Sequence, residues 1–365
     1  MISLKALRLG SMTVLAGLMV ALAAGCSNSD ETSATTGKAE SDLPDLSGQA
    51  LTYMGFGEAV DKIIGEVWNE PFAQATGAKV TTAGGLTYAK IHEQVDAGHV
   101  VDDVILGEPA EIDANCGTYY EEADVDLSVF PDSLQPFSDC GVPTGVYSTL
   151  LAYDEDAFPD GGPSSCADFF DTDKYPGKRL ISSYVPASAA LECAAIAAGG
   201  DPSDPYPIDL DAAFAKLEEI KDDIVFADLP GQQVDAMANQ DVQMGLMYND
   251  TVATATKQGA PFTSDFGFVL RQFAELGIVK GTEYPEAAQA YVQYVSQPDV
   301  ARRVVEEADF PFGIAAGFNS DQLDKLPKSV REWAPDQPDA IDVDQQWWID
   351  NHREINTRWN EFLTQ

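Results

Sequence analysis

Short apolar runs alternate with stretches of helical period along the first part of the chain. An apolar run at residues 50–54 predicts a strand that leads into Gly55-Phe56-Gly57, and residues 58–76 then repeat apolar side chains at helical spacing. Pro71 lies inside that period and is expected to kink or divide the helix. The same rhythm continues with a strand at 78–82, a helix at 87–97 and a strand at 100–106. Strands that alternate with helices predict a parallel sheet with right-handed crossovers.

The middle of the chain predicts a second α/β unit with its own core. A long extended run at 142–153 leads into this unit. Its strands and helices are predicted at 180–183, 187–198, 210–220 (capped by Asp209), 224–227, 232–239 and 242–248. The chain then returns to an extended region at 271–279, helices at 285–294 and 298–307, and a tail that carries Trp347, Trp348, Asn351 and Trp359 on a helical period.

The loops that follow the first three strands hold candidate ligand-binding residues. In open parallel sheets, ligands gather beyond the carboxyl ends of the strands. The loops at 54–57, 83–87 and 107–109 all lie at this edge of the predicted sheet. They contribute the candidate residues Phe56, Gly57, Gly85 and Glu108.

The first 25 residues have the layout of a signal peptide. Lys5 and Arg8 precede an uncharged apolar run at 9–24, and small residues lead up to Cys26. This layout resembles a bacterial lipoprotein signal, which implies that Cys26 receives lipid and becomes the new N-terminus; an ordinary secretory signal with an incidental cysteine is the alternative. Residues 26–48 are rich in Ser, Thr, Asp, Glu and Gly and are expected to form a flexible linker. We therefore expect a protein outside the cytoplasm, lipid-anchored to the cell membrane.

The balance of charge argues against some partners. The chain has 60 acidic residues and 21 Lys and Arg residues, for a formal net charge of -39 at pH 7. Such a surface repels nucleic acid and anionic lipid and favours cationic partners. A solubility device for a high-salt habitat is the alternative explanation of the same acidity. No nucleic-acid partner is expected.

Four cysteines remain after Cys26, and their even number in an oxidising compartment predicts two disulfides. Of the pairings open to four cysteines, the one between sequence neighbours is the simplest, with Cys116 bonded to Cys140 and Cys166 bonded to Cys193. No CxxC spacing occurs, which argues against a zinc site or a redox motif.

Motifs of the common catalytic chemistries are missing from the sequence. It contains neither HExxH nor GxSxG nor GxxxxGK[ST], and His92, His99 and His352 are too scattered to predict a set of metal ligands. We expect no enzyme activity, no cofactor and no bound metal. A tethered extracellular hydrolase is the alternative, because acid pairs suited to glycoside hydrolysis are available among the carboxylates.

Several short segments occur in a characteristic order. They are 51–58, Thr87-Tyr88-Ala89-Lys90-Ile91, Asp103-Val104-Ile105-Leu106, Tyr175-Pro176-Gly177-Lys178, Gly245-Leu246-Met247-Tyr248-Asn249 and Gln297-Pro298-Asp299-Val300-Ala301. Their order and spacing resemble the spermidine/putrescine-binding-protein-like family, the extracellular solute-binding lipoproteins of ABC importers, over nearly all of 51–363. The resemblance implies an α/β, two-lobed periplasmic-binding-protein fold of type II-like form. Each lobe is then a mostly parallel sheet flanked by helices, and hinge crossings join the two.

The resemblance also implies ligand-binding positions. An aromatic residue follows the first strand in this family, and Phe56 takes that place. The Tyr248-Asn249 step resembles the family's Trp-Asn step, in which the ring forms a pocket wall. Gln272 stands where the family has an aromatic residue, and Ser183 and Tyr184 stand where it has acids. Glu108 and Asp250, near predicted strand ends, could supply the carboxylates that a desolvated cation needs, although a surface or capping role is the alternative for each.

The implied lobes are 49–148 plus 272–310 and 149–271 plus 311–365, with crossings near 147–149, 268–272 and 310–313. Closure of the lobes would bury a small solute, with a polyamine or related amine as the first choice, for delivery to a membrane permease and its ATPase. The protein is expected to act as a monomer. Ferric ion or another small solute is the alternative ligand, although the ferric-binding relatives carry adjacent tyrosines where this chain has Tyr248-Asn249. A lipoprotein that senses or adheres without import is a further alternative.

Overall fold

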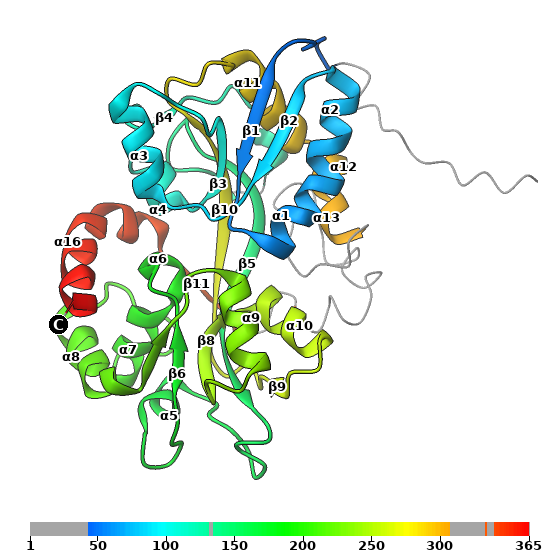
Figure 1. Cartoon of the computed structure of the whole chain (residues 1–365). Helices are drawn as coiled ribbons and strands as arrows, with labels where there is room; N and C mark the ends of the chain where they lie inside the picture. Colours follow the sequence, from blue (N-terminus) through cyan, green and yellow to red (C-terminus); the bar gives the residue numbers. More distant parts are fainter. Residues whose placement is uncertain (1–42, 131–133, 307–332, 334–338, 365) are drawn as a thin grey trace, which may run out of the picture. The chain divides into compact units, whose positions relative to one another are not determined.

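Two long antiparallel strands, β5 (Val142–Asp154) and β10 (Val269–Val279), pair at the centre of one mixed sheet (Figure 1). The structure is a computed structural model that describes residues 43–130, 134–306, 333 and 339–364. Along the sheet the strand order is β2-β1-β3-β10-β5-β8-β6-β7. The predicted signal peptide, the lipidation site Cys26 and the crossing at 310–313 lie outside the described residues.

The first parallel group of strands has the predicted order. β1 (Ala50–Met54) pairs in parallel with β2 (Lys79–Ala83) on one side and with β3 (Val104–Gly107) on the other. The crossovers run through α1 (Glu58–Ile64), a π-helical turn (Gly65–Asn69), α2 (Glu70–Thr76) and α3 (Tyr88–Ala97). The expected parallel arrangement is therefore confirmed.

Pro71 divides the long helix as expected, and the division takes the form of a π-helical turn. Proline has no backbone N–H, so the carbonyl oxygen of Val67 cannot accept the usual bond from position 71. The π-helical turn Gly65–Asn69 lies immediately before α2, in which Pro71 occupies the first turn. The helix ends where Gly77 takes a left-handed conformation with φ 75°.

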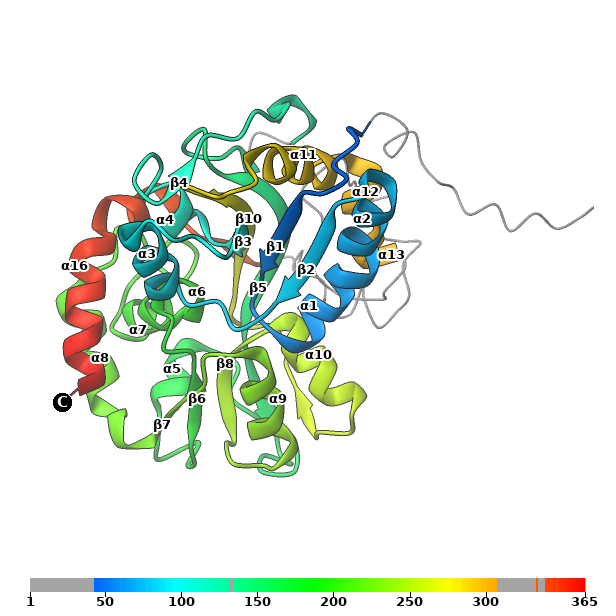
Figure 2. The ribbon, with the colours of Figure 1, turned by 45° about the horizontal axis from the view of Figure 1, so that its top comes forward.

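The second parallel group is β6 (Arg179–Ile181), β7 (Ile224–Phe226) and β8 (Met244–Tyr248), with β6 between the other two. Its helices are α5 (Cys166–Phe170), α6 (Val185–Ser188), α7 (Ala190–Ala197), α8 (Leu210–Glu219), α9 (Pro230–Ala238) and α10 (Asn249–Lys257). β5 pairs antiparallel with β8, which joins this group to the central pair. Figure 2 shows β6, β7 and β8 neighbouring one another beside α9.

The remaining strands pair with the central strands β5 and β10, and the remaining helices and turns lie outside the sheet. They are α4 (Pro109–Ile112), β4 (Tyr120–Glu121), a 3₁₀ turn (Leu127–Val129), a second 3₁₀ turn (Lys221–Asp223), β9 (Phe262–Thr263), α11 (Pro285–Val295), α12 (Pro298–Ala301), α13 (Arg303–Glu306), β11 (Ile341–Asp342) and α16 (Gln345–Thr364). No helix among the described residues is long and apolar enough to cross a membrane.

One predicted helix is divided in the structure. The predicted helix at 187–198 is two helices, because Ala189 adopts a left-handed conformation with φ 56° between α6 and α7. Ser296 ends α11 and donates to the carbonyl oxygen of Gln293, and Gln297 is the N-cap residue of α12. β8 pairs with β5 along one edge and with β6 along the other, and its residues 244–247 are buried.

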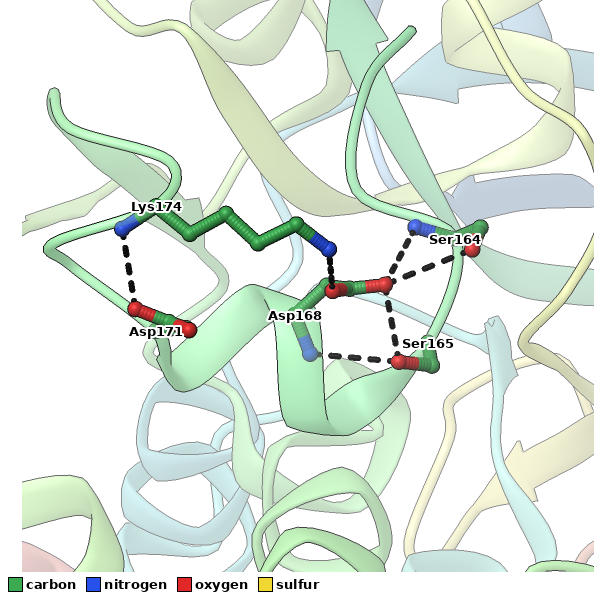
Figure 3. Close-up of polar contacts among 5 residues, drawn as sticks. All are labelled: Ser164, Ser165, Asp168, Asp171 and Lys174. Atoms are coloured by element: carbon green, nitrogen blue, oxygen red, sulfur yellow. Dashed lines mark hydrogen bonds and ion pairs between the residues drawn. The ribbon is translucent and has the colours of Figure 1, made fainter.

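Both predicted disulfides are confirmed. Cys116 is bonded to Cys140, and Cys166 is bonded to Cys193. The second bridge ties the start of α5 to α7. Close to it, the Asp168 carboxylate accepts from the Ser164 backbone N–H and from Lys174 Nζ at 2.8 Å, while Ser165 Oγ accepts from the Asp168 N–H as the N-cap of α5 (Figure 3).

Candidate functional site

A cavity of about 750 Å³ opens where the carboxyl ends of six strands converge. Residues just beyond β1, β2, β3, β6 and β7 line it, together with the last residue of β8, Tyr248. Seven of the ten predicted ligand-binding residues are in this lining, namely Phe56, Gly85, Glu108, Ser183, Tyr184, Tyr248 and Asp250. The strand-end argument thus brings residues far apart in sequence to a single cavity.

Glu108 is the buried carboxylate of this cavity. It precedes α4 as its N-cap residue, and its side chain is 4% exposed. The Tyr88 hydroxyl donates to its Oε2 and accepts from its backbone N–H at 3.2 Å. Burial raises the pKa of Glu108 to about 7, although hydrogen bonds from Tyr88 and Tyr184 act in the opposite direction. The site therefore holds a carboxylate that gains from a cationic neighbour.

Aromatic rings surround Glu108. The rings of Tyr88 and Tyr184 lie 5.3 Å apart between centroids, and those of Tyr147 and Tyr248 lie 5.9 Å apart in an edge-to-face arrangement. Burial raises the pKa of Tyr147 first, and the charge of Glu108 raises it further. Because the faces of aromatic rings attract cations, the tyrosines and the carboxylate favour the same kind of ligand group.

Asp250 supplies a second buried carboxylate, in the first turn of α10. Its side chain is 7% exposed and also lines a smaller cavity of about 190 Å³. Burial raises the pKa of Asp250 to about 6, and the backbone N–H of Thr251 opposes this shift. The exposed Asp228 and the His92-paired Glu111 line the main cavity as well.

The described lining contains no lysine or arginine. His92 and His352 are its imidazoles, and His92 Nε2 lies 2.7 Å from Glu111 Oε1 while the His92 ring stacks on Tyr119 at 3.8 Å. With four carboxylates and no fixed cation among these lining residues, the cavity is electrostatically suited to a positively charged group.

Three predicted ligand residues lie outside this lining, and their polar groups are bonded to the protein. Gly57 takes φ 110° at the N-cap of α1, and its N–H donates to Asp61 at 2.7 Å. Asn249 accepts from the Ser148 N–H at 2.9 Å and donates to the Trp333 carbonyl at 2.8 Å. Gln272 donates to Thr149 and to the carbonyl oxygen of Ala187. Ligand contact by these three residues stays a prediction.

The sequence reasoning missed several lining residues. Tyr88 opens the helix after the loop at 83–87, so the strand-end argument could have included it. Tyr147 lies in a predicted crossing, on β5 opposite Gln272. No signal in the sequence pointed to His352, Asn356 and Asn360, which come from α16 near the end of the chain.

In the part of the chain that the structure describes, no group of three or more His, Cys, Asp or Glu side chains is placed to hold a metal ion. Asn249, and not a second tyrosine, follows Tyr248 in the sequence, and its side chain is bonded to backbone groups of Ser148 and Trp333.

The comparisons with known proteins identify the class. Residues 68–317 match the model of the bacterial extracellular solute-binding protein family, and the chain belongs to this family. It is 31% identical over 327 residues to the gamma-aminobutyric acid-binding protein of Pseudomonas aeruginosa, a match that covers 86% of this chain and 90% of that protein.

Solved structures share the fold at lower identity. The periplasmic binding protein AgtB of A. tumefaciens R10 in complex with agropinic acid has a TM-score of 0.75 at 24% identity, over 87% of this chain and 99% of that one. The Atu4243-GABA receptor has a TM-score of 0.73 at 24% identity, over 86% and 97%. PotD of Streptococcus pneumoniae has a TM-score of 0.62 at 14% identity, over 86% and 99%. The expected two-lobed periplasmic-binding-protein fold is confirmed.

Proposed function

We propose that this protein is the solute-capturing component of an ABC importer and that its solute carries a primary ammonium group. Its lobes close on the solute and present it to a membrane permease served by an ATPase. The protein acts by binding and release, not by turnover. It works as a monomer, tethered to the membrane through lipid on Cys26.

One observation carries the choice of solute, namely the placement of Glu108. A carboxylate that is 4% exposed, bonded to Tyr88 and flanked by further tyrosine rings provides both the charge and the aromatic faces that an alkylammonium group needs. A carboxylate without a cation at such a site is costly, and a bound ammonium removes that cost.

Two further facts support an amine. Asp250 offers a second buried carboxylate on the same cavity, and the described lining has no lysine or arginine to compete for either acid. The relative from Pseudomonas aeruginosa is named for gamma-aminobutyric acid, which is a primary amine on a four-carbon chain. Polyamines contain the same group. The carboxylate of gamma-aminobutyric acid would have no lysine or arginine partner in the described lining, so the relative supports the ammonium end of the solute alone.

Calorimetry with four-carbon probes tests the proposal. Putrescine and 4-aminobutyrate carry an ammonium group, whereas butyrate and 1,4-butanediol keep the chain length without it. We expect measurable binding of at least one amine, none of butyrate or butanediol, and a loss of about tenfold or more in Glu108→Gln. Equal binding of butanediol and putrescine, or an unaffected Glu108→Gln variant, would contradict recognition through ammonium.

A further inference from the structure

The C-terminal helix α16 presents a polar stripe to the cavity. His352, Asn356 and Asn360 recur every four residues, lie on one face of the helix and all line the cavity. At the rise of an α-helix, this stripe of three residues extends over about 12 Å. We define it as the α16 stripe.

The adjacent face of α16 holds the stripe in place. Trp348, Ile355, Trp359 and Phe362 are buried on that face. Trp359 Nε1 donates to the carbonyl oxygen of Ser183 at 2.6 Å, and Trp348 Nε1 donates to Glu192 at 2.9 Å. Since Ser183 itself lines the cavity, the helix is fixed against a wall of the site.

The helix packs against two other helices, one of which begins directly after Glu108. α16 packs against α4, which begins directly after Glu108, and against α8, where the Trp359 ring lies 6.3 Å from Phe214 (Figure 1). The stripe therefore runs away from the neighbourhood of Glu108, along the cavity, towards Ser183.

The hydrogen-bonding groups of the stripe are uncharged amides and an imidazole nitrogen. Asn356 and Asn360 are exposed, and their side-chain amides have no partner among the described residues. His352 Nδ1 donates to the carbonyl oxygen of Ile349 at 2.9 Å, so Nε2 is the ring nitrogen that is open to a ligand. An amide both donates and accepts, and so does a hydroxyl group.

We propose that the α16 stripe is a second recognition site, which binds an uncharged tail of hydroxyl or amide groups on the amine solute. This inference rests on the proposed function, because Glu108 is assigned the ammonium end. A carboxylate tail fits less well, since the described lining already has four carboxylates and no lysine or arginine. A solute of this class fills more of the 750 Å³ cavity than a four-carbon amine does.

Three six-carbon amines separate the head from the tail. Hexylamine has the ammonium alone, 1-amino-1-deoxysorbitol adds five hydroxyls, and 6-aminohexanoate adds a carboxylate. Calorimetry on the full folded chain should show the aminosorbitol binding at least tenfold more tightly than either of the others. The double variant Asn356→Ala, Asn360→Ala should lose roughly that tenfold for the aminosorbitol and leave hexylamine unchanged, because two hydrogen bonds are removed from the tail only.

The controls lie on the same chain. Thr357→Ala alters an exposed residue of α16 outside the lining, and alanine favours the helix in all three substitutions, so the fold is preserved. Thr357→Ala should bind the aminosorbitol like the parent. Glu108→Gln should weaken all three amines alike.

Each other outcome contradicts a defined statement. If the aminosorbitol and hexylamine bind equally and Glu108→Gln weakens both, the tail site is wrong and the amine function stands. Tighter binding of the aminosorbitol that survives the double substitution removes the role of α16, and tightest binding of 6-aminohexanoate overturns the uncharged tail. If no amine binds the parent protein, the proposed function fails and the inference fails with it.

Discussion

The Tyr88 hydroxyl makes two hydrogen bonds with Glu108: it donates to the carboxylate and accepts from the backbone N–H at 3.2 Å. Tyr88 is the first residue of α3, and Glu108 directly follows β3. This pair of hydrogen bonds therefore connects α3 to the end of β3, where the carboxylate lies. It fixes the orientation of Glu108 before any ligand arrives, which lowers the entropic cost of binding.

Tyr88→Phe should remove both hydrogen bonds and keep the aromatic ring. The variant loses a hydrogen bond to the ionised carboxylate, so the pKa of Glu108 should rise further above its usual range. We expect amine affinity near pH 7 to fall by about 3- to 10-fold, the scale of one hydrogen bond to a charged group. Calorimetry with putrescine measures this loss. Tyr119→Phe, outside the cavity lining, is the matched control. If both variants lose the same affinity for putrescine, the Tyr88 hydroxyl has no specific role in holding Glu108.

Amine affinity should depend on pH through the two buried acids. Burial holds the pKa of Glu108 at about 7 and that of Asp250 at about 6, while the ammonium group of the ligand stays protonated. At low pH each acid must release its proton before it pairs with the ligand. Affinity should therefore rise as the pH increases from about 5 to 8, by at most about tenfold per pH unit for each proton released.

Glu108→Gln supplies the control for this dependence. This variant removes the acid with the higher pKa, so the rise in amine affinity between about pH 6 and pH 8 should flatten. The rise at lower pH, which Asp250 causes, should remain. A parent protein whose amine affinity is constant over this range would show that neither carboxylate contacts the ammonium group.

Glu275 is a buried acid that the binding site does not use. Its side chain is 0% exposed on β10, and neither carboxylate oxygen has a hydrogen-bond partner among the described residues. Burial raises the pKa of Glu275 well above its usual value of 4.5, and the charge of Asp113 raises it further. The folded protein thus keeps a proton that the unfolded chain releases. The contribution of Glu275 to the free energy of unfolding is fully present below its pKa in the unfolded chain. This contribution is lost as the pH rises through its pKa in the folded protein.

Glu275→Gln should remove that loss. Relative to the parent, the variant should gain about 1 to 3 kcal/mol in free energy of unfolding between pH 5 and pH 8, because a neutral amide never has to ionise. Urea denaturation at the two pH values measures the difference. Glu93→Gln, at an exposed position, should show no such change. An identical pH dependence in the parent and in Glu275→Gln would place the ionised form of Glu275 in contact with solvent.

The local apolar pattern predicted which segments form strands better than it predicted the residues at which those strands begin and end. β1 was predicted to the residue, because its apolar run is bounded by Gly55. β3 begins later than its apolar pattern implied, since Asp103 accepts from the Thr52 N–H at 2.6 Å and also bonds Thr282. Carboxylates that bond neighbouring backbone compete with the regular ladder, and that competition depends on tertiary contacts that periodicity does not record.

The candidate site was predictable to the extent that strand ends define it. Phe56, Glu108, Ser183, Tyr248 and Asp250 each follow or end a strand, and all of them line the cavity. Asn249 and Gln272 came from a family position instead, and the structure turns both side chains to partners within the protein. The α16 residues were out of reach, because nothing local indicates that a helix at the end of the chain closes one wall of the cavity.

Tyr248 tests the aromatic wall of the site. It ends β8, lines the cavity and meets the Tyr147 ring edge-to-face at 5.9 Å, while Phe56 lines the same cavity after β1. Tyr248→Ala and Phe56→Ala should each weaken amine binding by about 1 to 3 kcal/mol, the scale of a lost aromatic wall with its cation–π attraction. Both residues are half-buried, so the melting temperature without ligand should change little, and the ligand-induced rise should shrink because only the bound state uses the contact.

Phe137→Ala is the matched control for this wall, because Phe137 is 47% exposed and lies outside the cavity lining. It should keep both the amine affinity and the ligand-induced rise in melting temperature. Calorimetry and thermal unfolding on the three variants separate the two roles that a ring at this position can have. If Tyr248→Ala keeps its affinity but melts well below the parent without ligand, the ring is a packing residue for Tyr147. In that case Glu108 and Asp250 would have to hold the ammonium group without the Tyr248 ring. The aromatic rings of the site would then be those of Tyr88 and Tyr184.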